Sequence, residues 1–92
     1  MARYIKSDGT EQEVHPKNGY EFTLQEMRNY VDGSLEGLRL TKRLHMYLDE
    51  SGVLKGKPIN EVASEIVSQK RGKPVPVCGD VLIADVSETG DE

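Results

Sequence analysis

The arrangement of apolar and polar positions divides the chain into extended and helical stretches. Alternation is clearest in RLHMYLD, where Leu44, Met46 and Leu48 occupy every second position. A period of two is typical of a strand with one buried face, so these three side chains are expected in the core. The same alternation predicts that His45 and Tyr47 point outward, away from the core.

Other stretches also have strand character. Asp8-Gly9 lies between two extended segments and is typical of a hairpin turn. Glutamates in the second arm favour an edge strand, because charge discourages edge-to-edge pairing. A tight connection at Thr41–Lys42 would join LEGLRL to RLHMYLD, and the wholly apolar VLIA indicates a central strand. The expected strands cover residues 2–6, 10–15, 35–40, 43–49 and 80–86.

A first helix is predicted over about residues 24–32. Thr23 is a suitable N-cap, and Glu26 three residues later completes a capping box. Phe22 can pack on Met27 as a hydrophobic staple across the start of the helix. These are the strongest local signals in the chain.

A second helix is predicted to begin at Asn60, which is a favourable N-cap residue. Glu61 lies in its first turn and Lys70 and Arg71 in its last, where each complements the helix dipole. Gly72 ends it. Its apolar stripe consists of Val62, Ala63, Ile66 and Val67.

The resulting order is ββ-α-ββ-α-β, which predicts the α+β class. We expect a mixed, mainly antiparallel sheet of about five strands, with two short helices covering one face. A single domain would span residues 1–86, followed by an acidic, flexible tail at 87–92. The expected core positions are Leu24, Met27, Val31, Leu44, Met46, Leu48, Ile66, Leu82 and Ala84.

Composition restricts the functions available to the chain. Of its 92 residues, 36% are apolar, which suits one thin core and a shallow site better than a deep cavity. The net charge of −4 is uneven: residues 1–37, 38–76 and 77–92 carry −3, +4 and −5. Because phosphate affinity depends on clustered Lys and Arg, nucleic acid is a disfavoured partner, although the basic middle segment keeps it open.

The stretches NGYEFTLQEMRNYVDGSLEGLRL, LDESGVLKGKPIN and GDVLIAD together resemble a family known only as a domain of unknown function. Its members are small proteins of bacteriophages, prophages and other mobile elements, and the likeness runs from about Tyr4 to Asp85. Asp32-Gly33 stands where the family often has Gly-Gly, and Thr41-Lys42 where it often has a Gly-containing turn. The resemblance implies a phage-type accessory protein and supplies no catalytic residues.

Candidate chemistry is sparse. Cys78 is the single cysteine, so it suits a small apolar position better than a disulfide or a zinc site. A Cys78–His45 pair would need two separate surfaces to meet, and His15 and His45 lack the spacing of a metal site. We therefore expect no metal and no cofactor. No signal peptide or membrane-length apolar run is evident, which favours the cytoplasm, that of the host if the gene belongs to a phage.

GVLKGKP differs from a phosphate-binding loop, because Pro58 follows Lys57 where a helix should begin. Nearby basic residues could nevertheless form a shallow cationic surface. We expect a non-catalytic binding module for a host protein or a small anionic molecule, with a counter-defence role as one setting. The alternative is an assembly protein that self-associates, for example as a homodimer, through sheet edges. The candidate binding residues are Arg39, Lys42, Arg43, Lys55 and Lys57.

Overall fold

Five strands and two helices follow one another in the order expected from the sequence. The computed structural model describes residues 2–90. Its elements are β1 (Ala2–Ile5), β2 (Glu11–Val14), α1 (Leu24–Val31), β3 (Leu35–Arg39), β4 (Leu44–Asp49), α2 (Glu61–Arg71) and β5 (Val81–Asp85), with a short 3₁₀ helix, η1 (Val86–Glu88), at the end. The α+β class is confirmed.

The strands form one sheet in the order β2-β1-β5-β4-β3. Every neighbouring pair is antiparallel, so the sheet contains no parallel strands. The apolar β5 is the middle strand, as its composition predicts. This order leaves β2 and β3 as the two edges.

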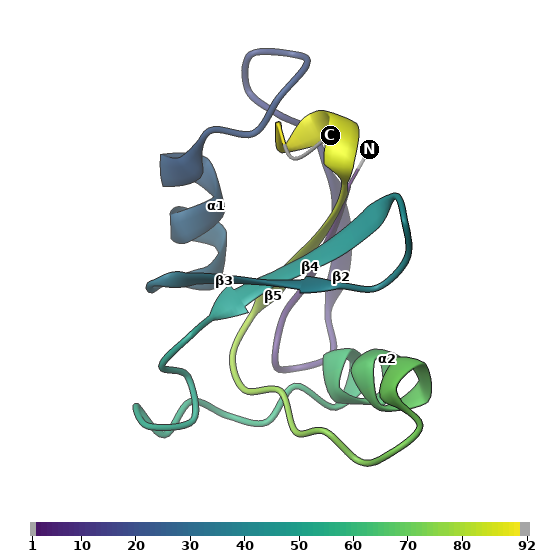
Figure 1. Ribbon diagram of the computed structural model, residues 1–92. Helices are drawn as coiled ribbons and strands as arrows, with labels where there is room; N and C mark the ends of the chain where they lie inside the picture. The colour runs from purple at the N-terminus through teal and green to yellow at the C-terminus, as the bar shows by residue number, and fades with distance from the viewer. Residues whose placement is uncertain (1, 91–92) are drawn as a thin grey trace.

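The two helices cover opposite faces of the sheet, which corrects the expectation that both cover one face. Figure 1 looks along the sheet, with α1 above it and α2 below. Alternating residues of β5 supply both interfaces: Leu82 and Ala84 pack on the α1 side, and Val81 and Ile83 on the α2 side. A run of uninterrupted apolar residues is therefore required in β5, because both of its faces are buried.

This arrangement also corrects the prediction for Tyr47. The alternation along β4 is as expected, with Met46 and Leu48 buried on the α2 side. The opposite face is covered by α1, so Tyr47 is 4% exposed and packs with the α1 cluster. His45 lies farther from α1 along β4 and is half-buried.

Most of the expected core positions are buried, but two are wrong. Leu24 is 51% exposed, because Phe22 fills the space beneath the first turn of α1. Leu44 is 38% exposed, because it begins β4 and pairs with Asp85 at the end of the ladder. Ile66 is partly buried against the core. The buried members of the set are Met27, Val31, Met46, Leu48, Leu82 and Ala84.

The predicted helix caps are confirmed. The Thr23 hydroxyl accepts from the Glu26 amide while the Glu26 carboxylate accepts from the Thr23 amide, the reciprocal capping box. Asp32 ends α1 in the left-handed conformation, with φ of 55°. Asn60 begins α2 and is fully buried; besides capping Ala63, its amide donates to the carbonyls of Ile5 and Gly79.

The segment after β5 starts with η1, in which the Glu88 side chain is buried at 8% exposure. The predicted tail, 87–92, thus begins inside this turn, and its last two residues lie outside the described part of the chain. Among residues 2–90, no helix has the length and apolar character needed to cross a membrane.

Candidate functional site

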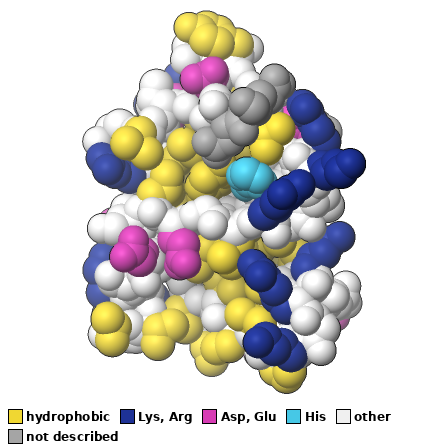
Figure 2. All heavy atoms as spheres, viewed as in Figure 1, with side chains coloured by type: hydrophobic (Ala, Val, Ile, Leu, Met, Phe, Trp, Pro, Cys, Tyr) yellow, Lys and Arg dark blue, Asp and Glu magenta, His cyan; other side chains and the backbone are white. Residues whose placement is uncertain are grey.

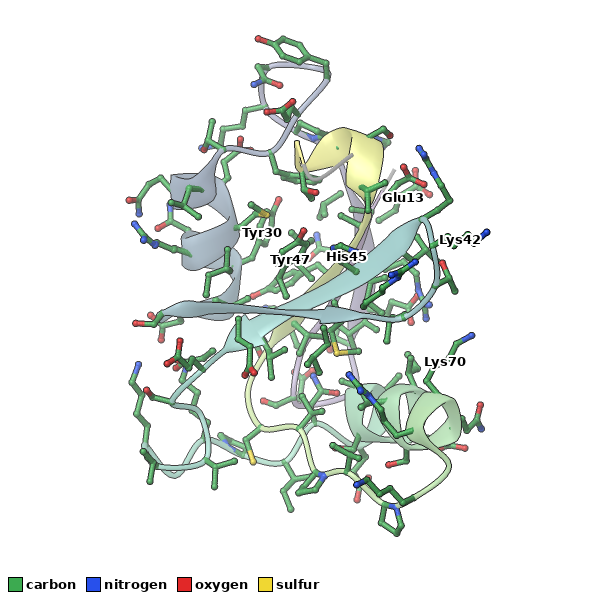
Figure 3. All side chains as sticks on the ribbon, viewed as in Figure 1. Glu13, Tyr30, Lys42, His45, Tyr47 and Lys70 are labelled. Atoms are coloured by element: carbon green, nitrogen blue, oxygen red, sulfur yellow. The ribbon has the colours of Figure 1, made fainter. Side chains whose placement is uncertain are left out.

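A wide, open hollow lies on the α1 side of the sheet, between β3, β4 and the start of η1. It measures about 820 Å³ and is lined by Gly37, Arg39, Lys42, Arg43, His45, Tyr47 and Val86. Figure 2 shows that Lys and Arg side chains gather toward one end of this face of the molecule, near the histidine. Figure 3 places His45 and Tyr47 on the α1 side of β4, and Lys42 at the β3–β4 turn.

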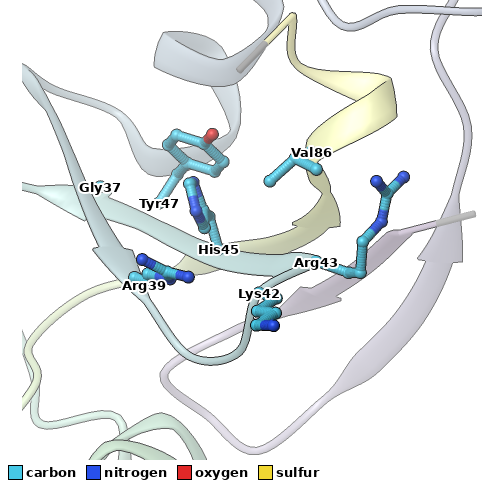
Figure 4. Close-up of a pocket in the computed structure, with 7 residues that line it drawn as sticks. All are labelled: Gly37, Arg39, Lys42, Arg43, His45, Tyr47 and Val86. Carbon is cyan, nitrogen blue, oxygen red and sulfur yellow. The ribbon is translucent and has the colours of Figure 1, made fainter. Parts of the chain in front are cut away.

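Strand register brings four of the lining residues together. Arg39 is paired with His45, so these two side chains share a face, and Gly37 is paired with Tyr47 on the same face. The His45 and Tyr47 rings have centroids 6.2 Å apart. Gly37 leaves room for the Tyr47 ring, since a Cβ there would lie 3.3 Å from Cε1 of Tyr47. The close-up in Figure 4 shows Arg39, His45 and Tyr47 as a continuous group beside the strand edge.

The β3–β4 turn shapes the basic end of the hollow. The Thr41 hydroxyl accepts from the amides of Arg43 and Leu44, at 3.1 and 3.0 Å, which holds the chain in a tight bend. The strands end at Arg39 and resume at Leu44, so the connection is longer than the predicted two residues. This bend sets Lys42 and Arg43 at the rim.

Arg43 is held by a carboxylate at that rim. Its guanidinium donates to Oδ1 of Asp85 at 2.9 Å. The same oxygen accepts from the Ser87 amide and hydroxyl, and these bonds, with Arg43, lower the pKa of Asp85 to about 2. Arg43 therefore contributes less net positive charge to the hollow than Arg39 or Lys42. For these two, the described residues supply no carboxylate partner.

Lys55 and Lys57 do not join the other three predicted binding residues. Both ammonium groups bind Oδ2 of Asp49, at 2.9 and 2.8 Å, and the Asp49 side chain is fully buried. Lys57 also donates to the carbonyls of Val31 and Asp32 at the end of α1. The loop that carries these lysines is thus a clamp that joins β4 to α1.

The charge of this clamp is partly compensated by Asp49. Burial by itself raises the pKa of the Asp49 carboxyl. Hydrogen bonds from Lys57, Lys55 and the Ser51 amide outweigh that effect and hold its pKa well below its usual range. Asp49 is therefore an anion that binds both lysines and offsets one of their two positive charges, and an outside anion would have to compete with it.

The structure separates the remaining candidate groups. Cys78 is buried and lines a different hollow, with Leu48 and Val77 of the α2-side core, so it cannot meet His45 on the α1 side. His15 contacts Glu13 at 3.2 Å on the exposed edge. No set of three metal-binding side chains gathers within residues 2–90.

Reasoning from the sequence missed His45 and Tyr47 as members of the site. Both lie on the face of β4 that was expected to be exposed to solvent and to have no function. A signal was available: in a two-stranded hairpin with this turn, Arg39 faces His45 directly across the ladder. Using this signal required knowing that α1 covers the His45 face of the sheet only in part.

Comparison with known proteins places the chain in a family. No curated protein and no solved structure matches it. A family model described as "Domain of unknown function (DUF3846)" matches residues 2–92. Because this match covers essentially the whole chain, the protein belongs to that family of unknown function.

Proposed function

We propose that this protein is a non-catalytic binding module that holds a small anionic molecule in the hollow at the β3–β4 turn. The observation that carries the proposal concerns Arg39 and Lys42. Both are exposed at the hollow that His45 and Tyr47 also line, and neither Arg39 nor Lys42 has a carboxylate partner among the described residues. By contrast, Arg3 is paired with Glu11 and Lys57 with Asp49. Unmatched cations at one hollow attract an anion.

The chemistry of the lining suits a phosphate-bearing ligand. A guanidinium can bind two phosphate oxygens at once, and an ammonium supplies a compact second charge. The half-buried His45 ring provides flat surface across the ladder from Arg39 for a planar group attached to the phosphate, and the buried Tyr47 ring supports it from the core side. The volume of about 820 Å³ falls in the range of small-molecule sites. The hollow is open to solvent, which suits a binding site better than an active site that must exclude water.

The test is a titration of isotope-labelled protein with pyrophosphate and with adenosine monophosphate, followed by amide chemical shifts. We expect the shifts to concentrate on β3, β4 and the turn between them. The Arg39→Gln and Lys42→Gln variants should each weaken binding several-fold. Lys70→Gln is the matched control, because it removes the same charge from the far end of α2. Equal loss in Lys42→Gln and Lys70→Gln would reduce the effect to general attraction and contradict the proposal.

An acidic group on a host protein would meet the same side chains. Retention of host proteins, rather than small molecules, by wild-type protein and their loss from Arg39→Gln would move the assignment to a protein partner. The resemblance described above supports the setting we propose: an accessory protein of a phage or mobile element that acts in the host cytoplasm by occupying its ligand. Such occupancy would serve counter-defence if the ligand were a signalling molecule.

A further inference from the structure

The two edges of the sheet differ in how they are protected. β2 reads EQEV, and a second copy paired to it would bring glutamates against glutamates. β3 reads LEGLR, with one acid near its start and one base at its end. No proline or bulge interrupts it, and its outer edge is open within the described part of the chain. The β3 edge therefore lacks the protection that β2 has.

The pairing with β4 determines which backbone groups of β3 point outward. The Glu50 amide donates to the Ser34 carbonyl, and the Leu40 amide to the Leu44 carbonyl, so residues 34 and 40 face β4. Hydrogen-bonded positions alternate along an antiparallel strand. The amides and carbonyls of Leu35, Gly37 and Arg39 consequently point away from the sheet. In Figure 2 this edge crosses the middle of the molecule as a band of backbone.

Charge is polarised along this edge. Glu36 and Glu50 lie where β3 begins and β4 ends. Arg39, Lys42 and Arg43 lie at the opposite end, around the turn. In Figure 2 acidic side chains lie below one end of the band, and most of the Lys and Arg side chains in this view lie toward the other end.

We propose that β3 pairs with β3 of a second copy of this chain, in antiparallel register about Gly37. Leu35 of each copy then lies opposite Arg39 of the other, and all three outward-facing residues enter the new ladder. The two-fold rotation sets the acidic end of each copy beside the basic end of its partner. Glu36 lies on the α2 side of the sheet and Arg39 on the α1 side, so these charges approach each other at the ends of the strands and not across the ladder. This end-to-end charge complementarity is absent from β2. Glycine at the centre removes any side-chain conflict at the closest crossing.

The dimer is expected to be weak and concentration-dependent. A pair of five-residue strands buries less than the ~1,000 Å² typical of a stable interface, so the ends of the hairpins must supply part of the contact. This proposal is independent of the anion site, although Gly37 and Arg39 adjoin both. Its variants are therefore placed at Leu35 and Glu36, outside the hollow.

The measurement is sedimentation velocity of the full chain over a wide concentration range at low salt. We expect a reversible monomer–dimer equilibrium that shifts toward monomer as salt rises. Leu35→Pro removes an outward amide without touching the β4 ladder and should abolish dimerisation, whereas Leu35→Ala, which loses the same packing, should dimerise. Thermal melts of both variants establish that they are folded.

Glu36→Lys provides a second test that does not perturb the backbone. It makes both ends of β3 positive, so the ends that meet in the dimer repel each other, and it should weaken the dimer several-fold, whereas the neutral Glu36→Gln should have a smaller effect. A wild-type monomer at every concentration would overturn the proposal, and so would a dimer indifferent to both Leu35→Pro and Glu36→Lys. Pyrophosphate binding by the Glu36→Lys monomer would show that the hollow functions alone, so the two proposals can fail separately.

Discussion

Lys57 is predicted to contribute far more to stability than Lys55, although the two lie two residues apart on one loop. Both bind the same oxygen of the buried Asp49, but the Lys57 side chain is 17% exposed and that of Lys55 is 48% exposed. Lys57 also satisfies two carbonyls at the end of α1. Replacement by methionine keeps most of the apolar stem of each side chain and removes only the charge.

The expected cost follows from burial. Removing one partner of a buried ion pair costs roughly 3–5 kcal/mol. Lys55 would still face Asp49 in the Lys57→Met variant, so we take the lower end, about 3 kcal/mol. The half-exposed Lys55 should cost about 1 kcal/mol or less. For a domain of this size, Lys57→Met should lower the melting temperature by about 15 °C.

The assay is urea unfolding of wild type, Lys55→Met and Lys57→Met at neutral pH, followed by circular dichroism. An unchanged slope against urea would show that the denatured states are comparable. If both lysines were solvated loop charges, each variant would lie within about 0.5 kcal/mol of wild type. That result, or equal losses for the two variants, would refute the assignment of Lys57 to a buried clamp.

Three further predictions concern the same core. The folded pKa of Asp49 is lowered, so its contribution to the free energy of unfolding is present above the unfolded pKa of about 3.9 and is lost as pH falls through the folded value. The urea midpoint of wild type should therefore fall below about pH 4, and Asp49→Asn should flatten this fall. An equal fall in the variant would contradict the prediction. Burial, together with Asp80, raises the pKa of Tyr4 to about 12, so the contribution of Tyr4 to stability is lost as pH rises through that value. Subtracting the absorbance titration of Tyr4→Phe from that of wild type should reveal one tyrosine that ionises near pH 12 instead of near pH 10. A methyl group at Gly33 would overlap the Asp49 carboxylate, so Gly33→Ala should cost up to about 3 kcal/mol in urea unfolding, more than a Gly37→Ala control.

Short-range signals in the sequence predicted the elements well. The caps at Thr23 and Asn60 depend on residues three positions away, and both are confirmed. The alternation in β4 likewise predicted that Met46 and Leu48 share one buried face, because side chains two positions apart point the same way along a strand. These features are local, so neighbouring residues are sufficient to specify them.

The features that were missed depend on contacts between distant segments. Whether a helix lies above or below the sheet depends on the path of its connections. Because α1 lies on the Tyr47 side, Tyr47 is a core residue and not the surface residue that was expected. The clamp is of the same kind: Lys57 reaches carbonyls 25 and 26 positions earlier in the chain. Asp49 shares the Tyr47 face of β4, so its burial follows only once α1 is known to cover that end.

The central position of β5 has a consequence for the order in which the molecule can be built. During synthesis the β1–β2 and β3–β4 hairpins leave the ribosome first, yet neither bonds to the other without residues 81–85 between them. Both helices also lack part of the apolar surface on which they pack until then, because β5 contributes residues to both cores. Isolated hairpins are marginal in water. The chain is therefore expected to remain largely unfolded until β5 emerges, and then to form both cores in a single late step.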